Sequence, residues 1–398
     1  MTGPALDGLH VLDLTTVVVG PACTLRLAQY GADVIKVEGP NGDLMRGLGG
    51  ESPTGQHSGT YLHLNRGKRN LGLDLKAPES QPVVERLLEW ADVVVANMRP
   101  QALERLGLDP VAVVDRFPRA IYCLITGFGT DGPYAGQPAY DSVVQGASGI
   151  AGLMLERDGT PRYVPLLLCD HIVGEIAAGS ILAALHQREH TARGCLIEVP
   201  MFETMAAFVL HEHLAQHSFD PPVGPPGDRR LLTPHNRPVQ TLDGWIAFTV
   251  NTDAQVRAFL EVTGRRELVG DPRFSSVAAR ATNVVDWFVV RGAPLTERST
   301  ADWLELLGSV DIPAQPIHTL ETLPSDPHLT AVGLLGDEEH PTEGRVVRIR
   351  PTIGFDGKYP DGGAPARPRG CDTHDILGEL GFEADQVRDL LASRAAFE

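Results

Sequence analysis

The first forty residues contain a strand, a helix and a second strand in close succession. Leu9 to Leu14 is a short apolar strand (HVLDL), TTVVVGPAC reads as a loop, and CTLRLAQYG is a helical pattern that stops at Gly31. The run DVIKVE, from Asp33 to Glu38, is a second strand. Two strands joined by a helix within about thirty residues form a right-handed crossover unit with parallel strands. The chain is therefore expected to be α/β and to open on a parallel sheet.

Strand and helix patterns continue to alternate beyond Glu38, with strands predicted over 92–96, over 120–125 and from Cys195, and helices over 78–90, 102–106 and 202–217. A chain of 398 residues exceeds what one compact core usually holds. Residues 219–238 (FDPPVGPPGDRRLLTPHNRP) form the clearest linker, because so much proline suits neither a helix nor a central strand. A smaller α+β unit is predicted after this linker.

Charge and cysteine usage narrow the functional classes. The formal net charge of −17 argues against a general nucleic-acid binder and against docking on anionic lipid, so neither nucleic acid nor membrane is expected as a partner. No run approaches the ~20 apolar residues of a membrane-spanning helix, and no signal peptide is recognised. The five cysteines contain no CxxC pair, which is typical of free thiols in a reducing compartment. A cytoplasmic location is therefore expected.

Two features resemble cofactor sites without completing them. Glu38 ends a strand as the ribose-binding acid of nicotinamide enzymes does, but the first loop offers only Gly20 and no GxGxxG, so no NAD site is expected. His213 and His217 share a helical face, but the HExxH pattern is absent and no third ligand is identifiable. We assign these histidines to an exposed helix face and expect no metal.

The stretch VPLLLCDHIVGEIAAGSILAAL, residues 164–185, holds a lone carboxylate, Asp170, where an apolar segment enters a helix of small residues. These small residues would let other backbone approach closely. Two interpretations of Asp170 are compatible with each other. It is a helix N-cap, for which Asp is among the best residues, or a nucleophile that the helix N-terminus keeps ionised and the apolar wall desolvates. A nucleophilic Cys169 is less favoured, because its neighbour His171 cannot face it.

Three further segments carry candidate binding residues. Arg66, Lys68 and Arg69 cluster just before a strand, either as ligands of a phosphate group or as part of a solvated loop. Residues 97–105 follow the strand DVVVA, and ligands of open α/β sheets bind at the carboxyl ends of strands. The loop TGFGTDGPYAGQPAYD is rich in Gly and Pro, and such loops usually carry function.

Taken in order, several segments resemble the family III CoA-transferases (CaiB/BaiF family) of the formyl-CoA transferase and carnitine CoA-transferase type. They are LDGLHVLDLTTVVVGPACT, YGADVIKVE with the following Gly42-Asp43 and Arg46, NRGKRNLGLDLK, ADVVVANMRPQALERLGL, and the span from Asp170 to RGCLIEVPMFE. The resemblance covers nearly the whole chain. It implies that Asp170 is the nucleophile. It also implies that coenzyme A, as the acyl-CoA substrate, is held at Val17, Val18, Asn97, Met98, Ala102, Arg105 and Tyr140.

The resemblance implies an architecture as well. A Rossmann-like large domain is built from both chain ends, here residues 1–218 and 321–398. The linker over 219–238 leads to a small α+β domain over 239–320. Two such chains are expected to thread through each other as an interlaced homodimer.

The sequence departs from the formyl-CoA transferase pattern at three places. Gly39 stands where that enzyme has an arginine near the adenine, so the contact is expected from Arg66, Arg69 or elsewhere. Position 16 is Thr instead of His, and the glycine-rich loop that closes over the active site has no counterpart. The specificity for oxalate and formate is therefore not transferable.

The related 2-methylacyl-CoA racemases provide the alternative function. They have a His in the segment where this chain has Tyr140, and Tyr, with a pKa of about 10, is a poor base. We therefore predict CoA transfer from an acyl-CoA donor to a free carboxylic acid, through an aspartyl anhydride and an aspartyl-CoA thioester on Asp170. Backbone amides near the helix start are expected to hold the developing oxyanion.

Overall fold

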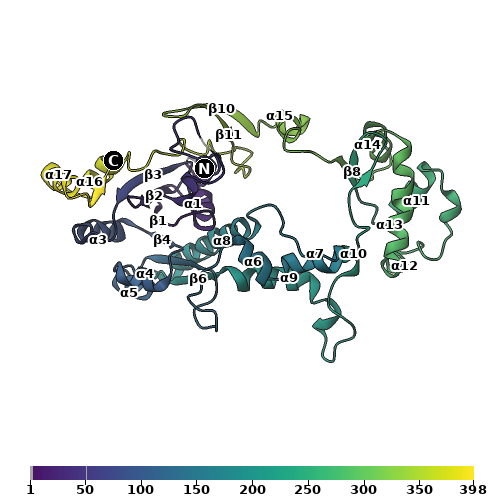
Figure 1. The fold of residues 1–398 in the computed structure, drawn as a ribbon, viewed down its shortest axis with the longest axis horizontal. Coiled ribbons are helices and arrows are strands. Elements are labelled where there is room, and N and C mark those ends of the chain that lie inside the picture. Colours follow the sequence, from purple (N-terminus) through teal and green to yellow (C-terminus); the bar gives the residue numbers. More distant parts are fainter. Residues whose placement is uncertain (1–2, 51) are drawn as a thin grey trace. The chain divides into compact units, whose positions relative to one another are not determined.

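The computed structural model describes residues 3–50 and 52–398, and the chain divides into two compact units (Figure 1). One unit combines the chain up to residue 149 with residues 163–208 and 328–398. The other comprises residues 150–162 and 209–327, so the proline-rich segment 219–238 lies within it. The first unit therefore draws on both ends of the chain.

A seven-stranded sheet forms the centre of the first unit. The strands follow the order β12-β3-β2-β1-β4-β5-β6, and all neighbours are parallel except β12 and β3. Because the order leads outward in opposite directions from β1 and β4, the loops after these two strands diverge and leave a crevice at the carboxyl edge. The strands are β1 (His10–Leu14), β2 (Asp33–Glu38), β3 (Lys68–Leu73), β4 (Val93–Ala96), β5 (Ile121–Thr126), β6 (Leu196–Pro200) and β12 (Ala396–Phe397).

The two faces of the sheet differ in chemistry, because side chains alternate along each strand. One face is apolar and joins a continuous core with five helices. The other carries buried polar side chains such as Asp13 and Lys36 and meets α1, whose Thr24 hydroxyl donates to Asp13 over 2.6 Å. The helices on the apolar face are α3 (Gln81–Trp90), α4 (Pro100–Arg105), α5 (Pro110–Arg116), α16 (Thr373–Glu379) and α17 (Ala384–Ala392).

Helices α1 (Val19–Gln29) and α8 (Leu168–Thr191) pack against each other at backbone distance. A Cβ atom at Gly174 of α8 would lie 2.7 Å from the carbonyl oxygen of Val19 and 2.9 Å from Cβ of Ala22. The expectation that small residues allow close approach is thus confirmed. By length and composition α8 could also cross a membrane, although no membrane-spanning helix was predicted from the sequence. In this unit it packs as a core helix, with Val173, Ala177, Ala178 and Ile181 buried.

Some elements differ from the predicted ones. The first helix begins at Val19 and not after Pro21, because proline is tolerated in the first turn of a helix. The segment after the Gly/Pro-rich loop forms two helices, α6 (Asp141–Ala147) and α7 (Ile150–Asp158), separated by Gly149 with φ 92°. Helix α8 ends at Thr191, and its C-cap residue Ala192 has φ 57°.

The first unit also contains a two-stranded antiparallel hairpin, β10 (Leu335–His340) and β11 (Gly344–Ile349), that returns toward the sheet. This unit further contains α2 (Gly59–Leu64) and most of α9 (Met201–His213), with α15 (Pro327–Ala331) at the return.

The second unit contains both helices and a small sheet. Its core surrounds Phe259, Trp287 and Trp303 and includes a three-stranded antiparallel sheet, β7 (Val239–Gln240), β8 (Trp245–Phe248) and β9 (Ala314–Pro316). Its helices, besides α7, are α10 (Arg229–Leu232), α11 (Asp253–Val262), α12 (Val277–Thr282), α13 (Val284–Gly292) and α14 (Thr300–Gly308).

Candidate active site

A cavity of about 400 Å³ opens in the first unit, where β1, β4 and β5 end. The loops after these strands, the start of α4 and the first turn of α8 form its walls. Arg99 and Asp170 are the charged side chains that line it within the described part of the chain. Neutral polar groups from Thr16, Asn97, Thr126, Thr130, Gln137 and Tyr140 complete the polar lining. A cavity of this size suits the reacting end of a ligand.

Asp170 lies in the first turn of α8, two residues after the helix begins. Only 6% of its surface is exposed, and it lines the cavity. The N-cap position belongs to Leu167, whose own side chain makes no capping hydrogen bond. Within residues 3–50 and 52–398, no hydrogen bond reaches the carboxylate oxygens of Asp170. The N-cap interpretation is therefore wrong, and the carboxylate is left unbonded at the cavity wall.

Burial, the larger cause, and the nearby negative charge of Asp141 together raise the pKa of Asp170 from 3.8 to about 7. The helix N-terminus favours the ionised form, but desolvation outweighs it, contrary to the expectation that the helix holds Asp170 ionised. Near neutral pH about half of these carboxyl groups are ionised. A desolvated carboxylate of this kind is a stronger nucleophile than one in water.

The neighbouring thiol is unsuited to the same role. Cys169 is fully buried, and burial raises the pKa of its thiol to about 12. A thiol is nucleophilic only as the thiolate. The preference for an aspartate nucleophile over a cysteine is therefore supported by the geometry.

A second carboxylate, Asp141, organises the turn from which Asp170 projects. Its Oδ2 accepts hydrogen bonds from the backbone N–H groups of Cys169 (2.7 Å) and Asp170 (3.2 Å). Its Oδ1 accepts from the Gln145 amide over 2.6 Å. Asp141 thus satisfies amides that a helix start otherwise leaves unpaired. The N–H groups of Cys169 and Asp170 are already hydrogen-bonded, so they do not form the predicted oxyanion site.

Gln145 extends this arrangement to the segment before α8. Its side-chain carbonyl accepts from the N–H of Val164 (2.8 Å), and its amide also donates to the carbonyl of Leu166 (3.1 Å). Asp141 and Gln145 are both almost fully buried. The first helical turn after the Gly/Pro-rich loop therefore fixes the chain that leads into Asp170.

The opposite wall is the loop between β1 and α1, which is held in an unusual conformation. Val17 has φ 70°, a left-handed value that is uncommon for a β-branched residue. Asp43 accepts from the Val17 N–H over 3.0 Å. The Asn97 amide binds both backbone groups of Thr16, accepting from its N–H (3.0 Å) and donating to its carbonyl (2.9 Å). Such strained positions persist only where the surroundings over-determine them.

Buried ion pairs support this loop from beneath. Lys36 pairs with Asp43 at 3.0 Å and also donates to the carbonyl of Thr15 over 2.8 Å. Lys68 pairs with Asp13 at 3.1 Å. Burial lowers the pKa of Lys68 to about 8, although the charge of Asp13 opposes the shift. Two of the four lysines of the chain are thus structural.

The structure brings together most of the residues predicted to bind CoA. Like Asp170, Val17, Val18, Asn97, Met98, Ala102 and Tyr140 line the cavity. Arg105 does not line it, but it lies three residues after Ala102 on α4, and residues three apart share a helix face. Arg105 and Ala102 are therefore on the same face of α4.

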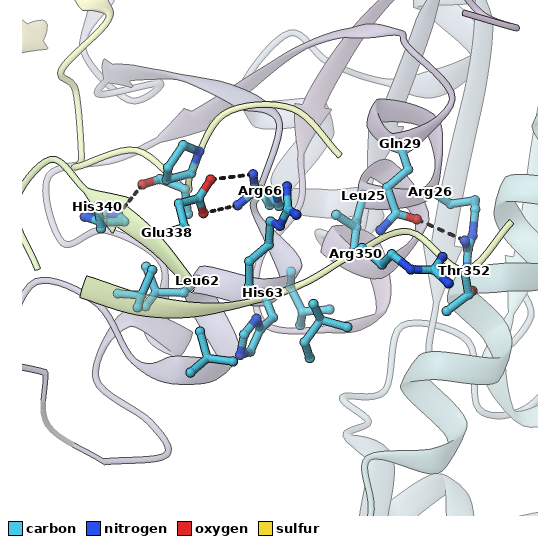
Figure 2. Close-up of a pocket in the computed structure, with 17 residues that line it drawn as sticks. Leu25, Arg26, Gln29, Leu62, His63, Arg66, Glu338, His340, Arg350 and Thr352 are labelled. Atoms are coloured by element: carbon cyan, nitrogen blue, oxygen red, sulfur yellow. Dashed lines mark hydrogen bonds and ion pairs between the residues drawn. The ribbon is translucent and has the colours of Figure 1, made fainter. Parts of the chain in front are cut away.

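Arg66 and Arg69 are not brought to this cavity. Arg66 precedes β3 and Arg69 is its second residue, so both lie at the amino edge of the sheet, whereas the cavity lies at the carboxyl edge. Figure 2 shows Arg66 paired with Glu338 of the hairpin, in a different cleft. Arg69 pairs with Asp33 (2.7 Å) and Glu379 (2.5 Å). A CoA contact by either arginine stays a prediction that this geometry does not support.

Sequence reasoning missed two residues of the site. Arg99 was noted only as part of the segment after β4, yet it contributes a positive charge to the cavity lining. Asp141 was noted only as the end of a loop. An Asp at a helix start with Gln four residues later was the available signal for a local pair, but its contact with Cys169 spans 28 residues of sequence.

The features that resembled cofactor sites are engaged in the fold. Glu38 pairs with Arg46 at 2.7 Å and accepts from the Tyr61 hydroxyl (2.5 Å) and the Asn70 amide (2.6 Å). His213 is buried, contrary to the expectation of an exposed face, and accepts from the N–H of Asp228 over 3.3 Å. No group of three His, Cys, Asp or Glu side chains among the described residues is arranged to hold a metal ion.

Comparison with known proteins decides the family. Residues 6–373 match CoA-transferase family III. The chain belongs to the family III CoA-transferases. Succinate–glutarate CoA-transferase of Agrobacterium fabrum is 34% identical over 343 residues, which cover 84% of this chain and 86% of that protein. Mouse succinyl-CoA:glutarate CoA-transferase is 30% identical over 396 residues, 98% of this chain and 89% of that protein.

Solved structures agree with this assignment. A CaiB/BaiF family protein from Brucella suis superposes with a TM-score of 0.80 at 28% identity, covering 95% of this chain and all of that chain. The Rv3272 protein of Mycobacterium tuberculosis gives a TM-score of 0.80 at 26% identity, over 94% and 99% of the two chains. This family III enzyme is a CoA-transferase with a mixed α/β fold, and the racemase alternative is not favoured.

Proposed function

We propose that Asp170 carries the acyl group and then CoA during transfer. The observation that supports this most is its geometry, a nearly buried carboxylate in a cavity at the carboxyl edge of the sheet, with no hydrogen bond from any residue that the structure describes. An ionised carboxylate needs no general base to attack a thioester. Asp141 acts through the backbone of α8 and is a positioning residue.

The proposed reaction has four exchanges. A carboxylate oxygen of Asp170 attacks the thioester carbon of the donor, the C–S bond breaks, and CoA leaves as the thiolate with an aspartyl anhydride formed. The thiolate attacks the Asp170 carbonyl carbon, which releases the donor acid as its carboxylate and leaves an aspartyl-CoA thioester. The acceptor carboxylate attacks that thioester and releases the CoA thiolate again. The thiolate finally attacks the acceptor carbonyl, which gives the new acyl-CoA and restores the Asp170 carboxylate.

Acyl-CoA binding is proposed along the carboxyl edge of the sheet, with the thioester in the cavity. Val17 and Val18 line one wall and Tyr140 another, and Asn97 holds the strained loop in place. Arg99 and Arg105 supply positive charge for the anionic parts of the substrates.

The proposed acceptors are short dicarboxylic acids. Relatives are named for succinate and glutarate, and a further one, from Haloarcula hispanica and 31% identical, for mesaconate. A second carboxylate entering a cavity beside Asp170 needs a compensating cation. Arg99 is the lining cation in the described part of the chain, so we propose that it receives the carboxylate that does not react.

Trapping tests the proposed intermediate. Enzyme incubated with succinyl-CoA and hydroxylamine is expected to gain an aspartyl hydroxamate at Asp170, detected by peptide mass spectrometry. Asp170→Asn should give no adduct and no transfer, while Asp158→Asn, a matched acid outside the cavity, should behave as the wild type. Deuterium exchange at the α-carbon without any adduct would instead indicate racemisation.

We further propose a Rossmann-like large domain, a homodimer and a cytoplasmic location. The strand order 3-2-1-4-5-6 supports the first. Exposed apolar side chains on α8, with Ile176 40% exposed, support burial against a second copy. Free cysteines, three of them buried, support a reducing compartment. Light scattering of the purified enzyme and fractionation of the source cells test the last two.

A further inference from the structure

A second cleft in the first unit, distinct from the Asp170 cavity, gathers arginines from three parts of the chain. It holds about 220 Å³ and lies between α1, the region around α2, and the β10–β11 hairpin (Figure 2). We call it the arginine cleft and define it by Arg26, His63, Arg66, Arg348 and Arg350, with Glu338 as its acidic member. None of its lining residues also lines the Asp170 cavity.

The hairpin face explains why these charges converge. Residues directly opposite each other in an antiparallel pair share a face, and Glu338 lies opposite Val346 while Gly336 lies opposite Arg348. Arg348 therefore points to the same side as Glu338, toward the cleft. Arg345 lies on the other side, where it pairs with Asp337. Alternation thus places one arginine of the strand in the cleft and one outside it.

The positive charge of the cleft is only partly neutralised. Arg66 pairs with Glu338, and Arg26 pairs with Glu175 of α8. Arg350 donates to the carbonyls of Val332 and Pro351. Arg348 forms neither a hydrogen bond nor an ion pair within the described residues, and its buried Nε, like that of Arg66, lacks a partner. Buried polar groups are normally hydrogen-bonded, so these donors need an explanation.

The remaining walls are apolar. Leu25, Leu62, Ile349, Pro365 and Ala366 surround the charged groups. In Figure 2 the Arg66–Glu338 pair lies on the side of His340, and Arg350 lies toward Arg26 and Thr352. An anionic group on a short apolar stem would satisfy both kinds of wall. We propose that the arginine cleft is a second binding site, for a small organic acid held by its carboxylate.

The location gives the site a physical link to the active centre. Helix α1 lines the Asp170 cavity with Val19 at its start, and it lines the arginine cleft with Leu25, Arg26 and Gln29 near its end. A ligand in the cleft contacts the same helix as the substrates. The proposal itself rests only on the cleft and not on the role of Asp170.

Binding of butyrate to the whole enzyme tests the proposal. The enzyme is first saturated with CoA, and butyrate is titrated while ligand-observed NMR reports binding. Wild type should bind butyrate but not the neutral analogue butyramide. Arg348→Gln should weaken binding about tenfold or more, as expected for the loss of a charged donor. Arg345→Gln, on the opposite face of the same strand, should bind as the wild type does.

Two further arms make the result decisive. His63→Glu, which adds a negative charge to the cleft, should also weaken butyrate binding. Wild-type affinity in both Arg348→Gln and His63→Glu, or loss of butyrate binding once CoA is present, would overturn the proposal. Inorganic phosphate that binds while butyrate does not would show that the ligand class is wrong.

Discussion

Replacing Asp141 by Asn should shift the pH dependence of the first acyl exchange toward lower pH. The pKa of Asp170 is raised from 3.8 to about 7 by burial and by the charge of Asp141, which corresponds to about 4 kcal/mol in favour of the protonated form. Only the ionised form attacks the thioester, so the rate is lost as pH falls through this pKa. At pH 6 about a tenth of the enzyme should be competent, and at pH 8 about nine-tenths.

The Asn side chain keeps an oxygen for the N–H groups of Cys169 and Asp170 but removes the charge. Desolvation remains, so the pKa of Asp170 in Asp141→Asn should lie below that of the wild type and still above 3.8. Single-turnover release of CoA thiol from succinyl-CoA, followed from about pH 5 to pH 9, directly measures how the rate falls at low pH.

Glu189→Gln provides the control, since Glu189 is an exposed acid near the other end of α8. Its pH–rate profile should coincide with that of the wild type. A wild-type rate that falls only near pH 4 would refute the raised pKa of Asp170. An unchanged pH–rate profile in Asp141→Asn would refute the part of the shift assigned to the Asp141 charge.

Three other predictions concern stability and binding. Asp170→Asn should abolish transfer and raise the free energy of unfolding at pH 8 by up to ~4 kcal/mol, because a carboxyl group with a raised native pKa loses stability for the fold as it ionises between about pH 4 and pH 7. Urea unfolding at pH 8 and at pH 4 should show this gain only at pH 8. Gly174→Ala should lose about 1–3 kcal/mol through overpacking against α1, whereas Gly378→Ala, at an open helical position, should gain up to ~1 kcal/mol. Asn97→Ala should free the Thr16 loop, raising the KM for acyl-CoA more than it lowers kcat.

Local sequence patterns predicted much of the fold. Short apolar runs predicted the bounds of β1, β2, β4 and β5 to within a residue or two. Parallel strands that are buried on both faces have near-continuous apolar sequences, which makes them easy to locate. The antiparallel edge strand β12 was missed. It has two residues, and its pairing with β3 bridges more than three hundred positions of sequence. No local pattern can report such a pairing.

The candidate site was predictable to the extent that its residues follow strands. Asn97 was predicted because ligands gather at the carboxyl ends of parallel strands, whereas Val17 was predicted from the family resemblance. For Arg66 and Arg69 a phosphate ligand stayed open beside a solvated loop, because their partners Glu338 and Glu379 are 272 and 310 residues away. A basic cluster in sequence therefore looks unpaired when the carboxylates that neutralise it come from the far end of the chain.

The two carboxylates at the start of α8 show why sequence alone gave Asp170 two roles. A helix start offers unpaired amides, and a carboxylate in the first turn is expected to bind them. Here Asp141 arrives from another helix and takes the amides of residues 169 and 170. The Asp170 carboxylate accepts no hydrogen bond from the described part of the chain and lies buried at the cavity wall, as a nucleophilic carboxylate requires. Reactivity at one acid thus depends on the structural role of the other, and Asp141→Asn tests both together.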